Sequence, residues 1–182
     1  MAGPLQGYGS GVKAGPAFFQ SMNTDVSSIV LSMFVYLVHH GDAVGSNVDP
    51  QRPLSSRGYQ QVEMLSRQVA ALPVSPTVIW HSGKLRARQT GQVYWRSCNA
   101  LAEFSATRWM QPDDPPRIAD VLQVEARDVM LVGHMPHLDR LRRHLLDEVL
   151  TPQSFPLHGV VALERDAAGW AERWQLQADS PA

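Results

Sequence analysis

The sequence has very little cysteine, since Cys98 is the only one among 182 residues. A single thiol excludes a disulfide within the chain and fits a reducing compartment. We therefore expect a cytoplasmic protein. No neighbour in the sequence favours a thiolate at Cys98, so this side chain is expected to pack on a helix.

An excess of charge of either sign is also absent. The chain has 16 Lys and Arg and 17 Asp and Glu, which gives a formal net charge of −1. Such a balance offers no general attraction to nucleic acid or to an anionic membrane, and neither is expected as a partner. Any attraction to phosphate must then be local to one site.

Long hydrophobic runs are missing as well. The apolar run over residues 29–38 is interrupted by Ser32 and is far too short to span a bilayer. It is also a poor secretory signal, because Lys13 is the only early positive charge. No membrane segment is therefore expected.

The beginning of the chain differs from the rest. Residues 1–15 are rich in glycine, and no acidic residue precedes Asp25. We interpret residues 1–32 as a leader, either disordered or added to the protein. Residues 33–178 are expected to form a single domain, which is long enough to bury a core.

From Met33 onward, short apolar runs typical of buried strands alternate with segments of helical periodicity. This alternation predicts an α/β fold, a three-layer α/β/α sandwich with a mainly parallel central sheet. Residues 159–164 and 170–176 flank a turn and predict a C-terminal antiparallel hairpin at the edge of that sheet. Strands are expected at 33–38, 78–80, 104–109 and 129–132, and helices at 56–72, at 84–97, after Pro116 and after Pro136.

Three of the expected junctions between a strand and a helix carry polar side chains. His39 and His40 follow the first strand, Arg86 follows the second, and His134 follows the strand at 129–132. Ligands of open α/β proteins bind beyond the carboxyl ends of parallel strands, so these side chains are expected to converge. Imidazoles and a guanidinium suit phosphoryl transfer, in which one ring attacks phosphorus and the cations hold its oxygens.

Four motifs resemble those of the histidine phosphatase superfamily in their order and spacing. The short chain and the closing hairpin are similar to its small SixA-type phosphohistidine phosphatases, and the resemblance runs from Met33 to about Leu176. The motifs are His39-His40-Gly41-Asp42-Ala43, Arg52-Pro53-Leu54-Ser55, Leu85-Arg86-Ala87-Arg88-Gln89-Thr90 and Gly133-His134-Met135-Pro136.

The resemblance implies a role for each site residue. His40 is the nucleophile that forms a phosphohistidine intermediate, and Arg86 clamps the phosphoryl oxygens. His134, as a cation, holds a further oxygen and stabilises the transition state, and Arg52 is a further phosphate ligand. The resemblance implies neither a metal nor a cofactor, and the spacing of His134, His137 and His144 matches no common metal motif.

Two departures from the family pattern affect function. The family has arginine where this chain has His39, and histidine is charged only part of the time near neutral pH, since its ordinary pKa is ~6.5. We predict a phosphate-binding role for His39 and a phosphatase that is weaker or more active in acid than its arginine-bearing relatives.

The second departure is the lack of a convincing general acid. Glu103, Asp113 and Asp114 lie in the segment that would supply one, without a motif. A phosphoramidate expels imidazole, a far better leaving group than an alkoxide, and needs less help from an acid.

The leading hypothesis is a phosphohistidine phosphatase that acts on a phosphotransfer protein through a covalent phosphohistidine enzyme intermediate. One alternative is a phosphatase of a small-molecule phosphomonoester. The other is a catalytically weakened phosphate-binding relative, in which His39 in place of the arginine indicates the loss of activity. The expected partner is a phosphorylated protein or a small phosphorylated substrate, and a monomer is expected. His158, which precedes the hairpin, remains open as a residue that approaches the pocket.

Overall fold

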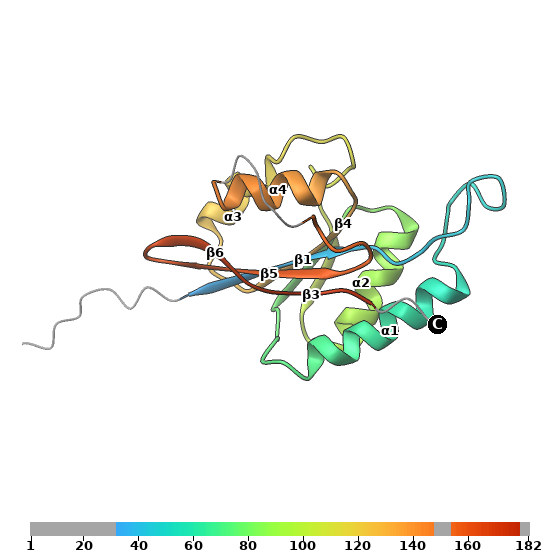
Figure 1. Cartoon of the computed structure of the whole chain (residues 1–182), viewed down its shortest axis with the longest axis horizontal. Helices are drawn as coiled ribbons and strands as arrows, with labels where there is room; N and C mark the ends of the chain where they lie inside the picture. Colours follow the sequence, from blue (N-terminus) through green and yellow to red (C-terminus); the bar gives the residue numbers. More distant parts are fainter. Residues whose placement is uncertain (1–31, 148–153, 179–182) are drawn as a thin grey trace, which may run out of the picture.

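The protein is described by a computed structural model over residues 32–147 and 154–178. The expected leader, residues 1–32, lies outside the described residues apart from Ser32. A six-stranded sheet forms the middle layer, with α1 and α2 on one face and α3 and α4 on the other (Figure 1). This architecture confirms the predicted three-layer sandwich.

The strands are β1 (Met33–His39), β2 (Val78–His81), β3 (Glu103–Ala106), β4 (Val129–Gly133), β5 (Val160–Asp166) and β6 (Gly169–Leu176). The helices are α1 (Ser56–Ala70), α2 (Leu85–Cys98), α3 (Ile118–Val124) and α4 (His137–Leu145).

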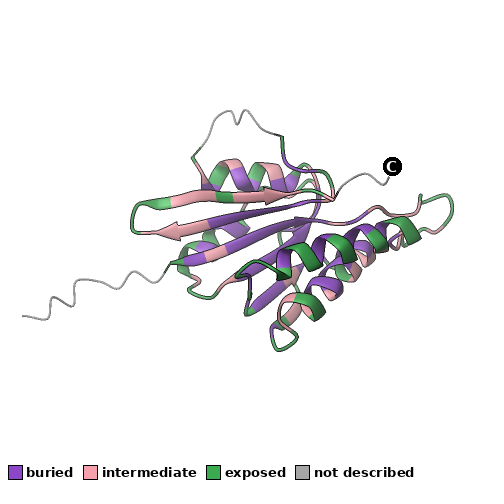
Figure 2. Ribbon diagram, turned by 60° about the horizontal axis from the view of Figure 1, so that its bottom comes forward, coloured by how far each residue is buried: buried purple, intermediate pink, exposed green. Residues whose placement is uncertain are grey.

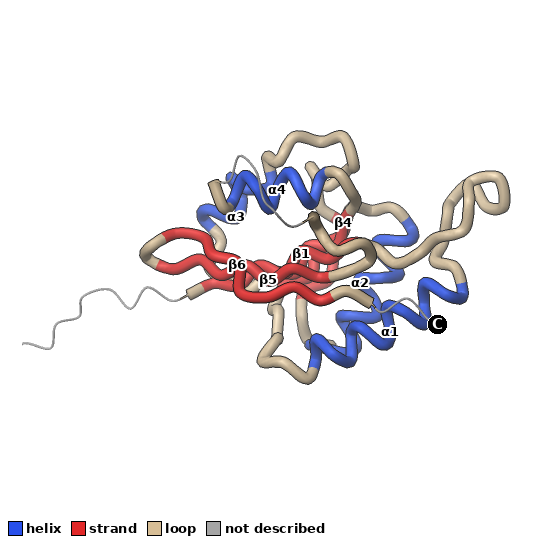
Figure 3. Tube along the Cα trace, viewed as in Figure 1, coloured by secondary structure: helices blue, strands red, loops and turns tan. Residues whose placement is uncertain are grey.

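The strand order across the sheet is β3-β2-β4-β1-β5-β6. The first four of these strands run parallel, and β5 and β6 form the predicted antiparallel hairpin at the edge. His39 lies opposite Gly133, and His81 lies opposite Val132. The carboxyl ends of β1, β2 and β4 are therefore level, and the loops that leave them lie at one end of the sheet (Figure 3).

The core has two parts, one on each face of the sheet (Figure 2). On one face, α1 buries Val62, Leu65 and Val69, the spacing that predicted this helix. On the other face, α4 buries Leu138 and Leu141. Helices with one apolar stripe and strands with no exposed face account for this layering.

The beginning of α1 fixes the loop that follows β1. The Ser55 hydroxyl accepts a hydrogen bond from the Gly58 N–H at 2.9 Å, which makes Ser55 the N-cap of α1. Gly58 is required here because a Cβ on it would lie 2.0 Å from the Asp42 carbonyl oxygen. The loop after β1 is therefore packed directly against the first turn of α1.

The main difference from the expected elements concerns β3. The strand ends at Ala106, whereas the apolar pattern predicts a strand as far as Trp109. Trp109 has φ +58, which leaves the extended conformation and turns the chain away from the sheet.

Cys98 is half-buried at the end of α2, and burial raises the pKa of its thiol to about 11, as expected for a packing residue. Within residues 32–147 and 154–178, no helix has the length and apolar character that crossing a membrane requires.

Candidate active site

The site is built where β1, β2 and β4 end, from the residues that the sequence predicts to converge. His40 is the first residue after β1, Arg86 is the second residue of α2, and His134 is the first residue after β4. The His40 ring lies 4.9 Å from the His134 ring, edge to face, and the Arg86 guanidinium contacts the His40 ring. The structure thus brings all three side chains together, and their catalytic roles remain predictions.

The hydrogen bonds of His40 determine which ring nitrogen can react. Nδ1 lies 2.7 Å from the Gly41 carbonyl oxygen, and since a carbonyl only accepts, Nδ1 carries the proton. Nε2 therefore keeps its lone pair. Burial, together with the charges of Arg86 and Arg52, lowers the pKa of His40 to about 4 although the Gly41 contact opposes the shift. The unliganded site holds a neutral imidazole, which is the nucleophilic form.

Arg86 is almost fully buried, and its Nε donates to His40 Nε2 at 3.2 Å. Burial and the neighbouring charge of Arg52 lower the pKa of Arg86, but a guanidinium remains charged in proteins. Its position in the first turn of α2 adds the positive end of the helix dipole to the site. Arg86 therefore holds a permanent positive charge against the lone pair of the nucleophile.

Thr90 is a site residue that the sequence interpretation missed as an individual residue. Its hydroxyl is fully buried, donates to the Arg86 carbonyl at 2.8 Å and accepts from the Gly41 N–H at 3.1 Å. It thereby ties the turn after the nucleophile to the helix that carries Arg86. A signal was present in the sequence, because Thr90 follows Arg86 by four residues and so lies on the same face of the helix.

His134 is buried, and its Nε2 is hydrogen-bonded to the Ser82 hydroxyl at 2.6 Å. Its Nδ1 is buried without a hydrogen-bond partner among the described residues. Burial, followed by the charges of His40 and Arg86, lowers the pKa of His134 to about 2. His134 is therefore neutral in the empty site, and its expected cationic form requires the charge of a bound phosphoryl group.

His39 differs from the expectation drawn from its ordinary pKa. Its Nδ1 accepts a hydrogen bond from the His158 N–H at 3.0 Å, and only 5% of the residue is exposed. Burial is the largest cause that lowers the pKa of His39 to about 3, followed by His40, His158 and Arg86. The residue in the place of the family arginine is thus held as a neutral imidazole. The expectation of a phosphatase that is weaker or more active in acid stays a prediction.

His158 also reaches the site, which the sequence left open. Its Nδ1 lies 2.6 Å from the His40 carbonyl oxygen, and its ring is stacked on the His39 ring at 5.0 Å between centroids. One ring nitrogen from each of His39, His40 and His158 lies within 4.8 Å of the other two, and this is the one group among the described residues whose spacing would suit a metal ion.

That group fits a metal poorly. Nδ1 of each of the three rings is already engaged in a hydrogen bond with the backbone. His39 Nδ1 must keep its lone pair for the His158 amide, so the remaining nitrogen of His39 carries a proton and cannot bind a metal. Arg86 would also repel a cation at His40. His137 is buried in the core and His144 is exposed on α4, so the other histidine spacing considered in the sequence forms no metal cluster among the described residues.

Arg52 belongs to the loop beside the site, and its expected role as a phosphate ligand remains a prediction. Its backbone has φ +50, and its Nε donates to the Val44 carbonyl at 3.3 Å. Its charge nevertheless reaches the centre, because it lowers the pKa of both His40 and Arg86. The two motifs around it are joined, since the Ser55 hydroxyl donates to the Asp42 carboxylate at 2.5 Å and Ala43 forms a β-bridge with Leu54.

Of the carboxylates considered as general acids, Glu103 lies far from the site and Asp114 is engaged in another contact. Glu103 begins β3, at the opposite end of the sheet, and pairs with Arg127 at 3.2 Å. The Asp114 carboxylate accepts from the Gln111 N–H at 2.8 Å, and Asp113 is exposed. Within the described ranges, no carboxylate has a hydrogen bond or ion pair with His40, Arg86 or His134.

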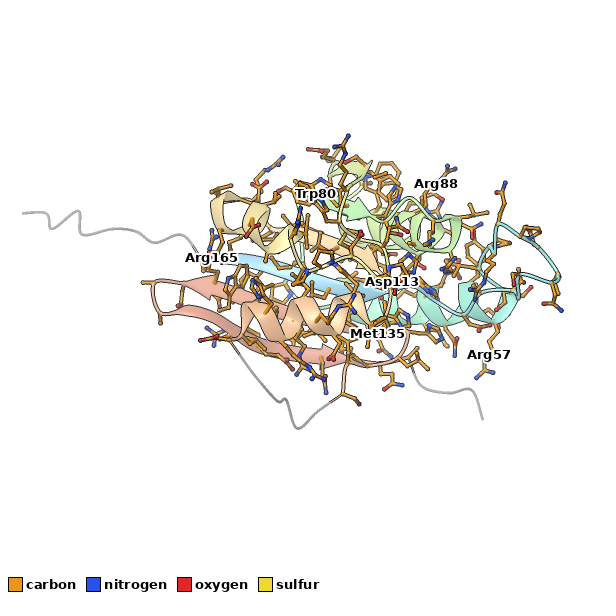
Figure 4. The ribbon with its side chains drawn as sticks, turned by 90° about the horizontal axis from the view of Figure 1, so that it is seen from above. Arg57, Trp80, Arg88, Asp113, Met135 and Arg165 are labelled. Atoms are coloured by element: carbon orange, nitrogen blue, oxygen red, sulfur yellow. The ribbon has the colours of Figure 1, made fainter. Side chains whose placement is uncertain are left out.

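The surface around the site is basic and open. A pocket beside Arg86 is lined by Lys84 and Arg88 from α2 and by the loop at Pro50 and Gln51. In Figure 4, Arg88 on α2 and Arg57 on α1 lie on either side of the end of the sheet toward which β1 points. His81 lies behind this pocket and is buried, with its Nδ1 accepting from the Gly83 N–H at 3.1 Å, so it packs rather than lining the mouth.

No protein-family model matches the sequence, and a search of curated proteins finds no match. Solved structures do match. A protein from Agrobacterium tumefaciens proposed to be the phosphohistidine phosphatase SixA is 27% identical with a TM-score of 0.67, over 79% of this chain and 97% of that one. The protein histidine phosphatase SixA in complex with tungstate is 21% identical with a TM-score of 0.70, over 80% and 97% of the two chains. A phosphoserine phosphatase from Entamoeba histolytica is 13% identical with a TM-score of 0.60, over 79% and 96%.

The fold and the placement of the two histidines and the arginine agree with these comparisons. In both respects the chain is similar to phosphatases of the histidine phosphatase superfamily. Within the superfamily, its likeness is to the small SixA-type proteins.

Proposed function

We propose that the protein is a phosphohistidine phosphatase that hydrolyses the phosphoramidate of a phosphorylated histidine on a phosphotransfer protein. The observation that carries the proposal is the state of His40, whose Nδ1 proton is held by the Gly41 carbonyl at 2.7 Å while Nε2 faces the Arg86 guanidinium at 3.2 Å. A neutral nucleophile and a fixed cation are thereby directed at one point.

The proposed reaction has two steps. His40 Nε2 attacks phosphorus, a new P–N bond forms, and the P–N bond to the substrate histidine breaks, with the released imidazole taking a proton. Water then attacks the phosphoryl group on His40, the P–N bond to His40 breaks, and inorganic phosphate leaves. Arg86 moves its donors from Nε2 to the phosphoryl oxygens, and His134, whose ring lies 4.9 Å from that of His40, supplies a further contact once the ring is protonated.

The surroundings of the site support a substrate with a good leaving group. Among the described residues no carboxylate is hydrogen-bonded to His40, Arg86 or His134, and a phosphoramidate needs less general acid catalysis than an alkyl phosphate ester does. Without general acid catalysis, an imidazole leaves more readily than an alkoxide. A small phosphomonoester is the alternative substrate, and we expect it to react more slowly for this reason.

The partner and the place of action follow from this proposal. The cations Lys84 and Arg88, which line the pocket beside Arg86, suit an acidic protein surface around the phosphohistidine. A phosphotransfer protein as substrate assigns the enzyme to signal transduction in the cytoplasm, and the single cysteine fits that compartment.

The test compares hydrolysis of a phosphohistidine-bearing protein, p-nitrophenyl phosphate and a panel of phosphorylated metabolites. The wild type is expected to prefer the phosphoprotein, and His40→Ala is expected to lose activity on every substrate. The matched control is His144→Ala, which removes an exposed histidine of α4 and should leave the rates unchanged. A sugar phosphate hydrolysed faster than the phosphoprotein would reverse the substrate assignment, and activity retained by His40→Ala would exclude the mechanism.

A further inference from the structure

His158 has a backbone conformation that needs an explanation. Its φ is +54, in the left-handed region that residues with a Cβ adopt at an energetic cost. Such a conformation persists only where surrounding contacts hold it, and residues of this kind gather at functional sites. The contacts that hold His158 all lead to the two histidines at the end of β1.

Two hydrogen bonds and a stacked ring join His158 to the site. The His158 N–H donates to His39 Nδ1 at 3.0 Å, and the His158 Nδ1–H donates to the His40 carbonyl at 2.6 Å. The His158 ring lies parallel to the His39 ring within 8°. The next residue completes the clamp, because the Gly159 carbonyl accepts from the His39 N–H at 3.0 Å.

The bond to His39 determines the proton position on that ring. A backbone amide can only donate, so His39 Nδ1 must keep its lone pair, and the proton of the neutral ring resides on Nε2. A proton on Nδ1 would break this bond and leave a buried amide without an acceptor, which is costly. His39 thus has one tautomer, with an N–H donor at Nε2.

We propose that His158 is a positioning residue that locks His39 as a neutral Nε2–H donor to the phosphoryl group, in the place where relatives have arginine. This inference rests on the proposed function, since it assigns a role toward the phosphoryl group of that reaction. The His39 and His40 rings lie 4.6 Å apart between centroids, so a phosphoryl group on His40 lies beside the ring that carries the His39 donor. Relatives have the charged donor of an arginine at this place. Here His39 supplies a neutral donor, and the His158 backbone orients it.

The lock also predicts how His39 responds to pH. The titratable and charged groups facing it are His40 on its own strand, His158 on the loop before β5, and Arg86 on α2. All are neutral or positive, so none favours a proton on His39. His39 should keep its tautomer and remain uncharged from pH 5 to pH 8.

The test is nitrogen-15 NMR of the imidazole rings, which distinguishes the two tautomers and the cation, combined with kinetics on a phosphohistidine-bearing protein. In the wild type we expect the Nε2–H tautomer of His39 at every pH from 5 to 8. In His158→Ala, which loses the bond to the His40 carbonyl, the tautomers should mix and kcat/KM should fall about 10-fold or more. Asparagine tolerates positive φ and keeps a hydrogen-bond donor. His158→Asn should therefore recover most of the Nε2–H tautomer of His39 and most of kcat/KM.

The NMR result does not depend on activity, so it separates this inference from the proposed function. Absence of a phosphorylated His40 in an enzyme that shows the predicted tautomer would contradict only the function. An Nδ1–H tautomer or a cationic His39 in the wild type would overturn the lock. So would equal losses of activity in His158→Ala and His158→Asn with the tautomer of His39 unchanged, because a merely structural residue behaves in that way.

Discussion

Arg86 Nε lies 3.2 Å from His40 Nε2, with the guanidinium almost fully buried in the first turn of α2. A permanent cation thus donates to the one lone pair of the site that is free to attack phosphorus. The charge of Arg86 adds to the effect of burial in lowering the pKa of His40, and it gives the phosphoryl group a charged ligand at the point of attack.

Replacing Arg86 should affect the chemical step more than any other single change apart from loss of His40. Arg86→Ala is expected to lower kcat/KM about 100-fold or more, or roughly 3 kcal/mol, because it removes a donor aimed at developing charge. Arg86→Lys should recover little, since an ammonium lacks the planar set of donors. The measurement is the rate on a phosphohistidine protein, with Arg96→Ala on the exposed face of the same helix as control. A loss below threefold in Arg86→Ala would mean that another group binds the phosphoryl oxygens.

Stability should fall in mild acid because three site histidines are held neutral. Burial lowers the pKa of His39 to about 3, that of His40 to about 4 and that of His134 to about 2, whereas the unfolded chain takes up protons near pH 6.5. Between these values the unfolded state binds more protons, so the free energy of unfolding decreases as the pH falls below about 6.5. The limiting slope is ~1.4 kcal/mol per pH unit for each histidine.

The slope is measured by urea unfolding from pH 7.5 to pH 4.5. His39→Asn should reduce the slope of the free energy of unfolding against pH by about the contribution of one histidine. His144→Ala, which removes an exposed ring, should leave that slope unchanged. A free energy of unfolding that stays constant down to pH 4.5 would show that these rings gain protons in the folded protein.

Thr90 should contribute to both stability and activity through the Gly41 amide. Thr90→Val keeps the shape but leaves the buried Gly41 N–H without an acceptor, at a cost of about 1–3 kcal/mol in the free energy of unfolding. The turn that holds His40 should loosen, and kcat should fall with it. Thr90→Ser retains the hydroxyl and serves as the matched control. Equal stability of the valine and serine variants would show that the hydroxyl is not needed.

Removal of metal ions should not change the rate. The Nδ1 atoms of His39, His40 and His158 are used in hydrogen bonds with the backbone, and Arg86 supplies the positive charge of the site. Dialysis against EDTA should therefore leave kcat/KM unaltered. Activity that is lost with the chelator and regained with Zn²⁺ would contradict this reading of the three histidines.

Much of the fold and the centre of the site could be predicted from the sequence. Buried strands alternating with helices define the layers, and level carboxyl ends of parallel strands bring His40, Arg86 and His134 together. These predictions succeed because they depend on periodicity and on the order of elements, which are local properties of the chain.

Other features depend on contacts that no local pattern encodes. The bond between His158 and His39 joins residues 119 apart and requires a positive φ at a histidine. The sequence likewise does not reveal the positive φ at Trp109, a residue that its hydrophobicity favours in a strand. The neutral state of His39 arises from burial and from that single amide, so its ordinary pKa was a poor guide.

The central claim is that His40 carries the phosphoryl group during turnover. The most direct measurement is rapid quench of the wild type with a phosphorus-32-labelled phosphohistidine protein, followed by mapping of the label on the enzyme. The account predicts a label that is stable in alkali, labile in acid and located on His40, and that is absent from His40→Ala. Turnover without such a label, or a label on another residue, would contradict it.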